Sequence, residues 1–287
     1  MKISILTTIA LLAFAGNSVL CRLALGGQLI DANSFTIIRL ISGAITLLAL
    51  LLLSGSSIPN IKTELNSKTL LKGGYLFFYA ALFSYAYIIL DTASGALLLF
   101  ASVQFTMIFV QFVNGNKPSN QELTGLFLAI VGFVYWMLPS SQSPSLLGAI
   151  LMVLSGVAWA GYTLAGKHSK NAKLDTTKNF IISLLFIVLL LPGYGIFIEF
   201  NITSVGLIYA VASGSLASGI GYWIWYSVLP NLSISSASVL QLLVPILAAF
   251  GGFIWTGEAI TGSFILACIL ILAGILLVVN KQTKTRT

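Results

Sequence analysis

The chain has 287 residues, of which 58% are apolar and only 7% are charged, and its mean hydropathy is +1.02. A water-soluble domain of this length would need far more polar side chains to cover its surface, so the composition excludes one. We therefore predict an all-α membrane protein that crosses the lipid bilayer many times, with loops too short to hold a soluble domain.

Ten apolar runs follow one another, at about residues 3–25, 34–53, 71–90, 96–113, 122–138, 146–166, 177–198, 205–229, 237–255 and 263–279. Each is near the roughly 20 residues that a helix needs to cross about 30 Å of hydrocarbon, which predicts ten transmembrane helices. The first run could instead be a signal peptide, because Lys2 precedes an apolar core and a small-residue site at residues 13–15. The run continues unbroken to Leu25, so we expect a membrane helix there.

The lysines fall in the two tails and in alternate loops, whereas the intervening loops hold Asp31, Asp91, Glu199 and Glu258. Basic residues collect in cytoplasmic loops, so this pattern predicts ten membrane spans with both termini in the cytoplasm. The net charge of +7 then reports topology, and we expect no nucleic-acid partner.

Small residues recur at fixed distances in the two halves. Ala267 and Gly274 lie nine and sixteen residues after Glu258, and Gly125 and Gly132 lie at the same distances after Asn116. We predict two five-helix repeats, residues 1–143 and 144–287, that face opposite ways in the membrane because five is odd. Inverted repeats of this kind are typical of secondary transporters, which bind substrate between the halves near the midplane. Small residues seven apart also give a helix face for close packing.

Apart from Lys72 and Lys178, each the second residue of its run, Arg22 and Arg39 are the only cationic side chains inside apolar runs. Intramembrane charges usually face the protein interior and pair, and Asp31 and Asp91 lie toward the same membrane face. One interpretation is a structural ion pair that joins the first three helices. Others are an outer gate or a carboxylate anchor, for which the forked guanidinium is well suited. Arg22 could also extend to the interface.

Pro245 lies in the middle of the run 237–255 and frees the carbonyl of Gln241. A free carbonyl is tolerated in a membrane only beside protein or a water-lined cavity, so we predict that this helix faces a cavity and bends at Pro245. Glu258 precedes the last helix and is predicted to cap its N-terminus. Coupling of transport to protons is left open.

Polar and aromatic side chains predicted near the midplane are candidates for a substrate cavity. They are Asn17, Tyr79, Tyr85, Gln104, Trp159, Tyr162, Tyr222 and Gln241. Each aromatic residue alone is more often a packing or interface residue. Together they would suit an amphipathic organic solute. We expect no metal site or cofactor, because Cys21 and Cys268 are distant in sequence and the single histidine lies in a lysine-rich loop.

Several stretches resemble EamA-type members of the drug/metabolite transporter superfamily. They are residues 15–25 (AGNSVLCRLAL), 38–40 (IRL), 94–100 (SGALLLF), 103–107 (VQFTM), 220–223 (IGYW) and the C-terminal stretch 235–280 with its proline, Gly-Glu turn and glycine-bearing helix. The resemblance implies ten helices around a central cavity and export of amino acids, metabolites or drugs by alternating access. The first half departs from the pattern, since it lacks the proline and the Gly-Glu pair.

From the sequence we predict a secondary active transporter, an exporter of amino acids or similar small amphipathic metabolites, that works as a monomer or homodimer and not as an enzyme. The alternative is a lipid-carrier flippase subunit or a membrane partner protein that does not transport. A wide lateral opening lined by apolar groups would favour this alternative.

Overall fold

The computed structural model describes residues 2–56, 65–115, 120–137, 144–166, 169, 171–193, 199–232 and 240–284. These residues are helical, apart from short connections and one isolated antiparallel β-bridge between Ile30 and Ile202. The first five apolar runs form α1 (Lys2–Leu25), α2 (Ala32–Leu53), α4 (Ser67–Ile89), α5 (Thr92–Val113) and α6 (Asn120–Met137). The prediction of an all-helical protein is therefore confirmed.

The last five runs are also helical but less regular. They form α7 (Leu146–Gly166), α8 (Ala172–Ser183) with the 3-10 segment η1 (Leu184–Gly193), α9 (Ser204–Ala212) with the π-helical η2 (Ser213–Ile220), α10 (Gly221–Val228) and η3 (Leu229–Asn231), α12 (Leu243–Gly251) with the π-helical η4 (Gly252–Thr256), and α13 (Gly262–Lys284). Among the described residues, six helical segments are long and apolar enough to span a membrane, and two further apolar helices are shorter. Ten membrane helices fit this arrangement.

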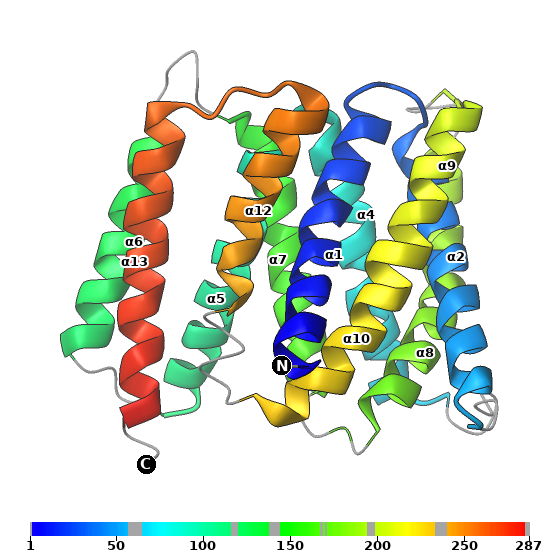
Figure 1. The fold of residues 1–287 in the computed structure, drawn as a ribbon, viewed down its shortest axis with the longest axis horizontal. Helices are drawn as coiled ribbons and strands as arrows, with labels where there is room; N and C mark the ends of the chain where they lie inside the picture. The colour runs from blue at the N-terminus through cyan, green and yellow to red at the C-terminus, as the bar shows by residue number, and fades with distance from the viewer. Residues whose placement is uncertain are drawn as a thin grey trace.

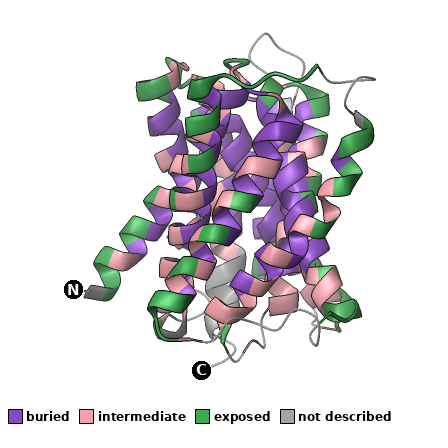
Figure 2. Cartoon of the chain, turned by 90° about the vertical axis from the view of Figure 1, so that its right-hand side faces the viewer, coloured by how far each residue is buried: buried purple, intermediate pink, exposed green. Residues whose placement is uncertain are grey.

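The helices form one bundle with α6 and α13 paired at one end and α2 and α9 at the other (Figure 1). Between them lie α1, α4, α5, α7 and α12, and the start of α1 lies on the same side of the bundle as the end of α13. Buried residues follow the inside of the bundle along its length, whereas the outside is exposed (Figure 2). Many exposed side chains are large and apolar, such as Ile45, Phe109 and Phe250. An apolar exterior is what a protein embedded in lipid requires, so this is an integral membrane protein.

Glycines allow the closest helix contacts. A Cβ added to Gly274 of α13 would lie 2.4 Å from the carbonyl oxygen of Gly125 on α6, and one added to Gly132 would lie 2.6 Å from the Cβ of Leu270. The small residues noted in the two halves therefore meet where α6 packs on α13. A Cβ on Gly214 of η2 would lie 2.3 Å from the carbonyl oxygen of Arg39, so η2 and α2 are equally close.

The sequence predicted that Pro245 lies in the middle of a regular helix, and this prediction is wrong. The regular helix α12 begins at Leu243, and a turn at Leu242 separates it from helical residues 240 and 241. Pro245 is thus in the first turn, where its missing N–H leaves no hydrogen bond unmade. The irregular backbone lies just before the proline, next to Gln241, and the hinge role of Pro245 stays a prediction.

Candidate functional site

A small cavity lies inside the bundle and is lined by side chains from α1, α4, α5, α7, α10 and the chain just before α12. The lining residues are Phe14, Asn17, Ser18, Tyr79, Phe83, Leu99, Phe100, Trp159, Tyr222 and Gln241. Its volume is about 20 Å³. That is room for about one water molecule, so the helices are closed around it.

Aromatic rings form most of the wall. The ring centroid of Trp159 lies 4.8 Å from that of Tyr79 and 5.2 Å from that of Tyr222, and Phe14 lies 5.7 Å from Tyr222 edge to face. Asn17 accepts a hydrogen bond at its Oδ1 from the Ser213 hydroxyl at 2.7 Å. The cavity thus combines aromatic faces with a few neutral polar groups, which is the usual lining of a site for small organic molecules.

Five of the eight predicted cavity residues, Asn17, Tyr79, Trp159, Tyr222 and Gln241, line this cavity, and their contact with substrate stays a prediction. Tyr162 lies behind the wall, 5.4 Å from the Trp159 ring, and its hydroxyl accepts a hydrogen bond from Asn179. Tyr85 donates to the Asn33 Oδ1 at 2.6 Å, and Gln104 is buried on α5 outside the lining.

Arg39 is buried behind the same wall, with 2% of its side chain exposed. Its Nε donates to the Ser218 hydroxyl at 3.3 Å and its Nη2 to the Tyr79 hydroxyl at 3.1 Å. The guanidinium carbon lies 5.0 Å from the Phe83 ring centroid and 5.2 Å from that of Tyr79. Among the described residues no carboxylate forms an ion pair with Arg39. The predicted Arg–Asp pair is therefore wrong for Arg39.

Arg22 does form the predicted ion pair with Asp91, at 3.5 Å, but its shorter contact is one that the sequence did not predict. Its Nε donates to the Glu258 carboxylate at 2.9 Å, and the second oxygen of Glu258 accepts from the backbone N–H of Thr92 at 2.9 Å. Arg22, Asp91 and Glu258 join the end of α1 to the start of α5 and the end of η4. We call them the outer ion cluster, because they lie at the end of the bundle away from the first residues of α1 (Figure 1). Partial burial raises the pKa of Asp91 above its ordinary value, the negative charge of Glu258 adds to the rise, and Arg22 opposes it.

Glu258 does not cap the last helix, contrary to the prediction. Helix α13 begins at Gly262, and the Thr261 hydroxyl accepts the hydrogen bond from the Phe264 N–H at 3.2 Å. Glu258 instead caps α5, because it accepts from Thr92, the first residue of that helix. Gly257 precedes it with a φ of +68°, a left-handed conformation that favours glycine and turns the chain back toward α5.

Asp31 also has a local role in the structure. Its carboxylate accepts from the backbone N–H and the hydroxyl of Ser34, at 2.9 and 2.6 Å, and so caps α2. It also accepts from the Asn201 N–H at 3.2 Å, which ties the connection between α1 and α2 to the start of α9.

The sequence did not identify Ser213 and Ser218 as polar partners of the site. Both lie on the π-helical η2, where Ser213 bonds Asn17 and Ser218 bonds Arg39. In a sequence, small residues at such spacing indicate only close helix packing. A π-helical turn in a buried helix is frequent at functional sites, but composition alone does not predict where one forms.

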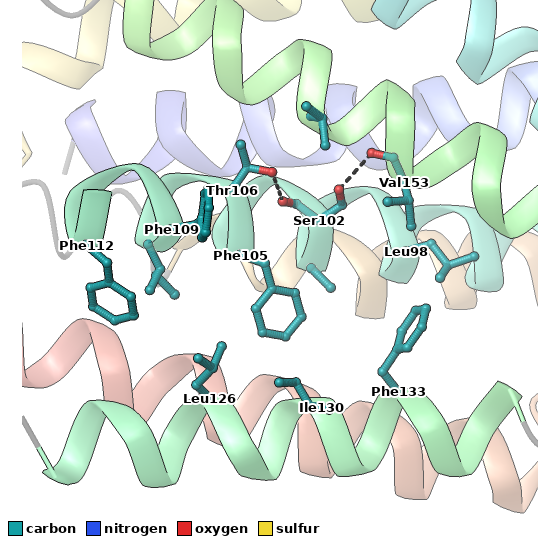
Figure 3. A pocket seen from close by; sticks show the side chains of 13 residues that line it. Leu98, Ser102, Phe105, Thr106, Phe109, Phe112, Leu126, Ile130, Phe133 and Val153 are labelled. Carbon is teal, nitrogen blue, oxygen red and sulfur yellow. Dashed lines mark hydrogen bonds between the residues drawn. The ribbon is translucent and has the colours of Figure 1, made fainter. Parts of the chain in front are cut away.

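A larger cavity of about 420 Å³ lies between α5, α6 and α7, apart from the central one. Figure 3 shows Phe105 on α5 pointing toward Leu126, Ile130 and Phe133 on α6. The two polar side chains in its wall are already satisfied, since Ser102 donates to the Val153 carbonyl and Thr106 to the Ser102 carbonyl (Figure 3). This groove is suited to apolar groups and offers no polar anchor.

The fold and the cavity together define an integral membrane protein of helical bundle type with a small internal cavity. The EamA-like transporter family matches residues 146–280. An uncharacterized protein of Pseudomonas aeruginosa is 42% identical over 97% of this chain and 94% of its own length. An uncharacterized transporter of Archaeoglobus fulgidus is 25% identical over 98% of each chain.

A further relative, described as a "probable amino-acid metabolite efflux pump" of Escherichia coli, is 24% identical over 63% of this chain and 65% of its own. One solved crystal structure has the same fold, with a TM-score of 0.64 over 94% of this chain and 97% of that chain at 18% identity. The chain belongs to the EamA-type transporters of the drug/metabolite transporter superfamily, so the resemblance seen in the sequence is confirmed.

Proposed function

We propose that the protein is a secondary active transporter that exports amino acids or similar small amphipathic metabolites across the bacterial inner membrane. The observation that carries the proposal is the central cavity, where six aromatic rings and two side-chain amides from different helices converge. The efflux pump among its relatives supports the substrate class. The start of α1 and the end of α13 lie on one side of the bundle, which supports a topology with both termini in the cytoplasm (Figure 1).

The pattern of helix contacts supports the proposal that residues 1–143 and 144–287 are inverted repeats. In this scheme α1 corresponds to α7, α4 to the helix α9–η2–α10, α5 to α12, and α6 to α13. Helix α7 packs on α4 and α5, and α1 packs in the same way on the α9–η2–α10 helix and on α12. Helices α6 and α13, the proposed equivalents, pack on each other. Such a two-fold arrangement places the cavity between the repeats.

We propose alternating access in which α4, α5, α10 and α12 move around the cavity. The outer ion cluster links α1, α5 and η4 on the side away from the termini. On the side of the termini, a groove of about 380 Å³ lies between the first half of α1 and the start of α12. The ion cluster closes one end of the bundle and the groove opens the other, which supports an inward-facing, nearly occluded state.

Counterflow in proteoliposomes tests this function. Proteoliposomes that contain the purified chain are loaded with one unlabelled solute at a time. Labelled amino acids, other small metabolites or a cationic drug are then added outside, with equal or different pH on the two sides. Saturable exchange of amino acids is expected, and a dependence on the pH step would indicate proton coupling. The Trp159→Ala variant should lose exchange, whereas Trp255→Ala, on the exposed surface, should retain it. Absence of any exchange by folded protein would contradict the proposal.

The apolar groove between α5, α6 and α7 favours a second candidate function, a flippase subunit for a lipid carrier. The groove is large enough for part of an acyl chain and lies among membrane-spanning helices. In that case a fluorescent polyisoprenyl lipid should cross the bilayer in vesicles that contain the protein, and a Phe105→Trp change that fills the groove should slow it. No lipid movement together with solute counterflow would exclude this candidate.

A further inference from the structure

Arg39 carries a positive charge in the interior that no described acidic side chain compensates. The sequence holds only seven acidic residues. Of these, Asp91 and Glu258 bind Arg22, and Asp175 binds Lys178. A guanidinium keeps its proton in proteins, so Arg39 remains charged in this apolar setting. An unpaired buried charge is strongly unfavourable, and a fold that keeps one needs a compensating interaction.

The guanidinium of Arg39 is held in a fixed orientation with one nitrogen unused. Ser218 accepts from Nε and Tyr79 from Nη2, and the rings of Tyr79 and Phe83 lie against its face. The Nη1 nitrogen is buried and has no hydrogen-bond partner among the described residues. Two N–H donors of a charged group are thus positioned and unsatisfied.

This unused donor lies next to the central cavity. Tyr79 and Phe83, which contact the guanidinium, both line the cavity. Tyr222 lines it too, with its ring centroid 5.2 Å from that of Trp159. The amide nitrogen of Asn17, also in the lining, makes no hydrogen bond to the described protein atoms, since only its oxygen is bonded, to Ser213. A charged donor directly behind the wall and a neutral donor in the wall are therefore both unused beside the same space.

We infer that Arg39 binds a carboxylate of the transported solute through Nη1, with the Asn17 amide as a second donor. The inference rests on the proposed transport function and narrows its substrates to solutes that carry a carboxylate. A single carboxylate matches the single unpaired charge. A doubly charged phosphate would need another cation, and the other intramembrane arginine, Arg22, is already bound to Glu258 and Asp91. The rest of the solute would pack against the aromatic rings.

The test compares ligands that differ only in the carboxylate. Thermal stabilisation of the purified full chain in detergent is titrated with the common L-amino acids and with their amides. At least one acid should reach half-saturation at a concentration about ten- to hundredfold below that of its amide. The amide oxygen can still accept a hydrogen bond from Arg39, but the amide lacks the negative charge that strengthens this bond. Arg39→Gln should abolish this difference, and Arg39→Lys should retain part of it. Lys173→Gln, which removes a charge from α8 beside Trp223, is the matched control and should leave it unchanged.

Three results would overturn the inference: equal stabilisation by acids and amides, an unchanged difference in Arg39→Gln, or no stabilisation by any acid. Should Arg39→Gln fail to fold, the wild-type comparison of acid with amide and the Arg39→Lys variant still decide the matter. Counterflow separates this inference from the proposed function. Exchange that ignores the carboxylate removes the inference and keeps the transporter, whereas acid-selective binding without exchange supports the site and contradicts transport.

Discussion

The outer ion cluster can be tested by the change Glu258→Gln, which keeps the shape of the side chain and removes its charge. Glu258 accepts from Arg22 and from the Thr92 N–H, both at 2.9 Å. The side chains of Arg22 and Glu258 are 22% and 14% exposed. The Arg22–Glu258 pair is therefore intermediate between an exposed ion pair, which contributes about 0.2–1 kcal/mol, and a buried one, whose disruption costs about 3–5 kcal/mol. We expect a loss of about 2 kcal/mol, since a hydrogen bond with a charged group contributes about 1.5–3 kcal/mol.

A loss of that size corresponds to a fall in melting temperature of roughly 4–8 °C for a chain of this length. The assay heats the purified protein in detergent and measures the folded protein that remains by size-exclusion chromatography. Asp91→Asn is the comparator in the same cluster, because Asp91 is 61% exposed and 3.5 Å from Arg22. It should change the melting temperature by no more than about 1 °C, as expected of an exposed pair. The double change Arg22→Gln/Glu258→Gln should lose less than the sum of the single changes.

The native Cys21 reports whether the cluster also closes the outer side. Cys21 precedes Arg22, is 0% exposed and lies 3.8 Å from the Ser213 hydroxyl. In a Cys268→Ser background, a membrane-impermeant maleimide should label Cys21 faster in Glu258→Gln than in the parent. Equal melting temperatures for the glutamate and aspartate variants, together with unchanged labelling, would show that Glu258 is not what holds the outer end closed.

Three further expectations follow from the same geometry. Gly214→Ala should destabilise the protein by about 1–3 kcal/mol, because its Cβ would lie 2.0 Å from the Ser42 Oγ. Gly16→Ala should not destabilise it, because no atom lies within 4 Å of the added Cβ. Thermal unfolding of both variants measures the difference. Pro245→Ala should leave the melting temperature nearly unchanged and slow counterflow, and a wild-type exchange rate would remove the hinge hypothesis. Asp91→Asn should be as stable as the parent or more stable at pH 7. The pKa of Asp91 is raised above 3.8 in the fold, so its ionisation disfavours the folded state and stability falls as pH rises through that window. The difference should vanish below about pH 3.8, and a variant that is less stable at pH 7 would contradict this sign.

The helices could be predicted from the sequence because each apolar run is long enough to span lipid and is bounded by polar turns. Their ends agree closely in the first half, where α2 follows the cap residue Asp31. Prediction was poorer around Pro245, because the proline is compatible both with a kink inside a helix and with the first turn of a new one. The structure has the second, and only the backbone at Leu242 distinguishes them.

The candidate site could be predicted in part for a similar reason. Aromatic and amide side chains in membrane helices are few, so Asn17, Tyr79 and Trp159 could be chosen by depth alone, and the structure brings them together. The partners of the charges could not be chosen that way. Glu258 is 236 residues from Arg22, and Asp31 is nearer in sequence to either arginine, yet Glu258 forms the shortest ion pair of Arg22. Pairing depends on which helix ends meet, and one sequence does not contain that information.

The two arginines show how the fold treats the same charge differently at two depths. At the outer end Arg22 meets two carboxylates from separate helices, so its charge is neutralised within the protein and serves to hold those helices together. In the interior, the partners of Arg39 among the described residues are two hydroxyls and two rings, all neutral. Charges interact more strongly in a medium of low dielectric constant, so the uncompensated charge of Arg39 acts strongly on the neighbouring cavity. A solute anion that neutralises Arg39 would bind more tightly in the closed cavity than in an open, hydrated one. The closed state is therefore the one that such a substrate would stabilise, which is the property that occlusion in a transport cycle requires.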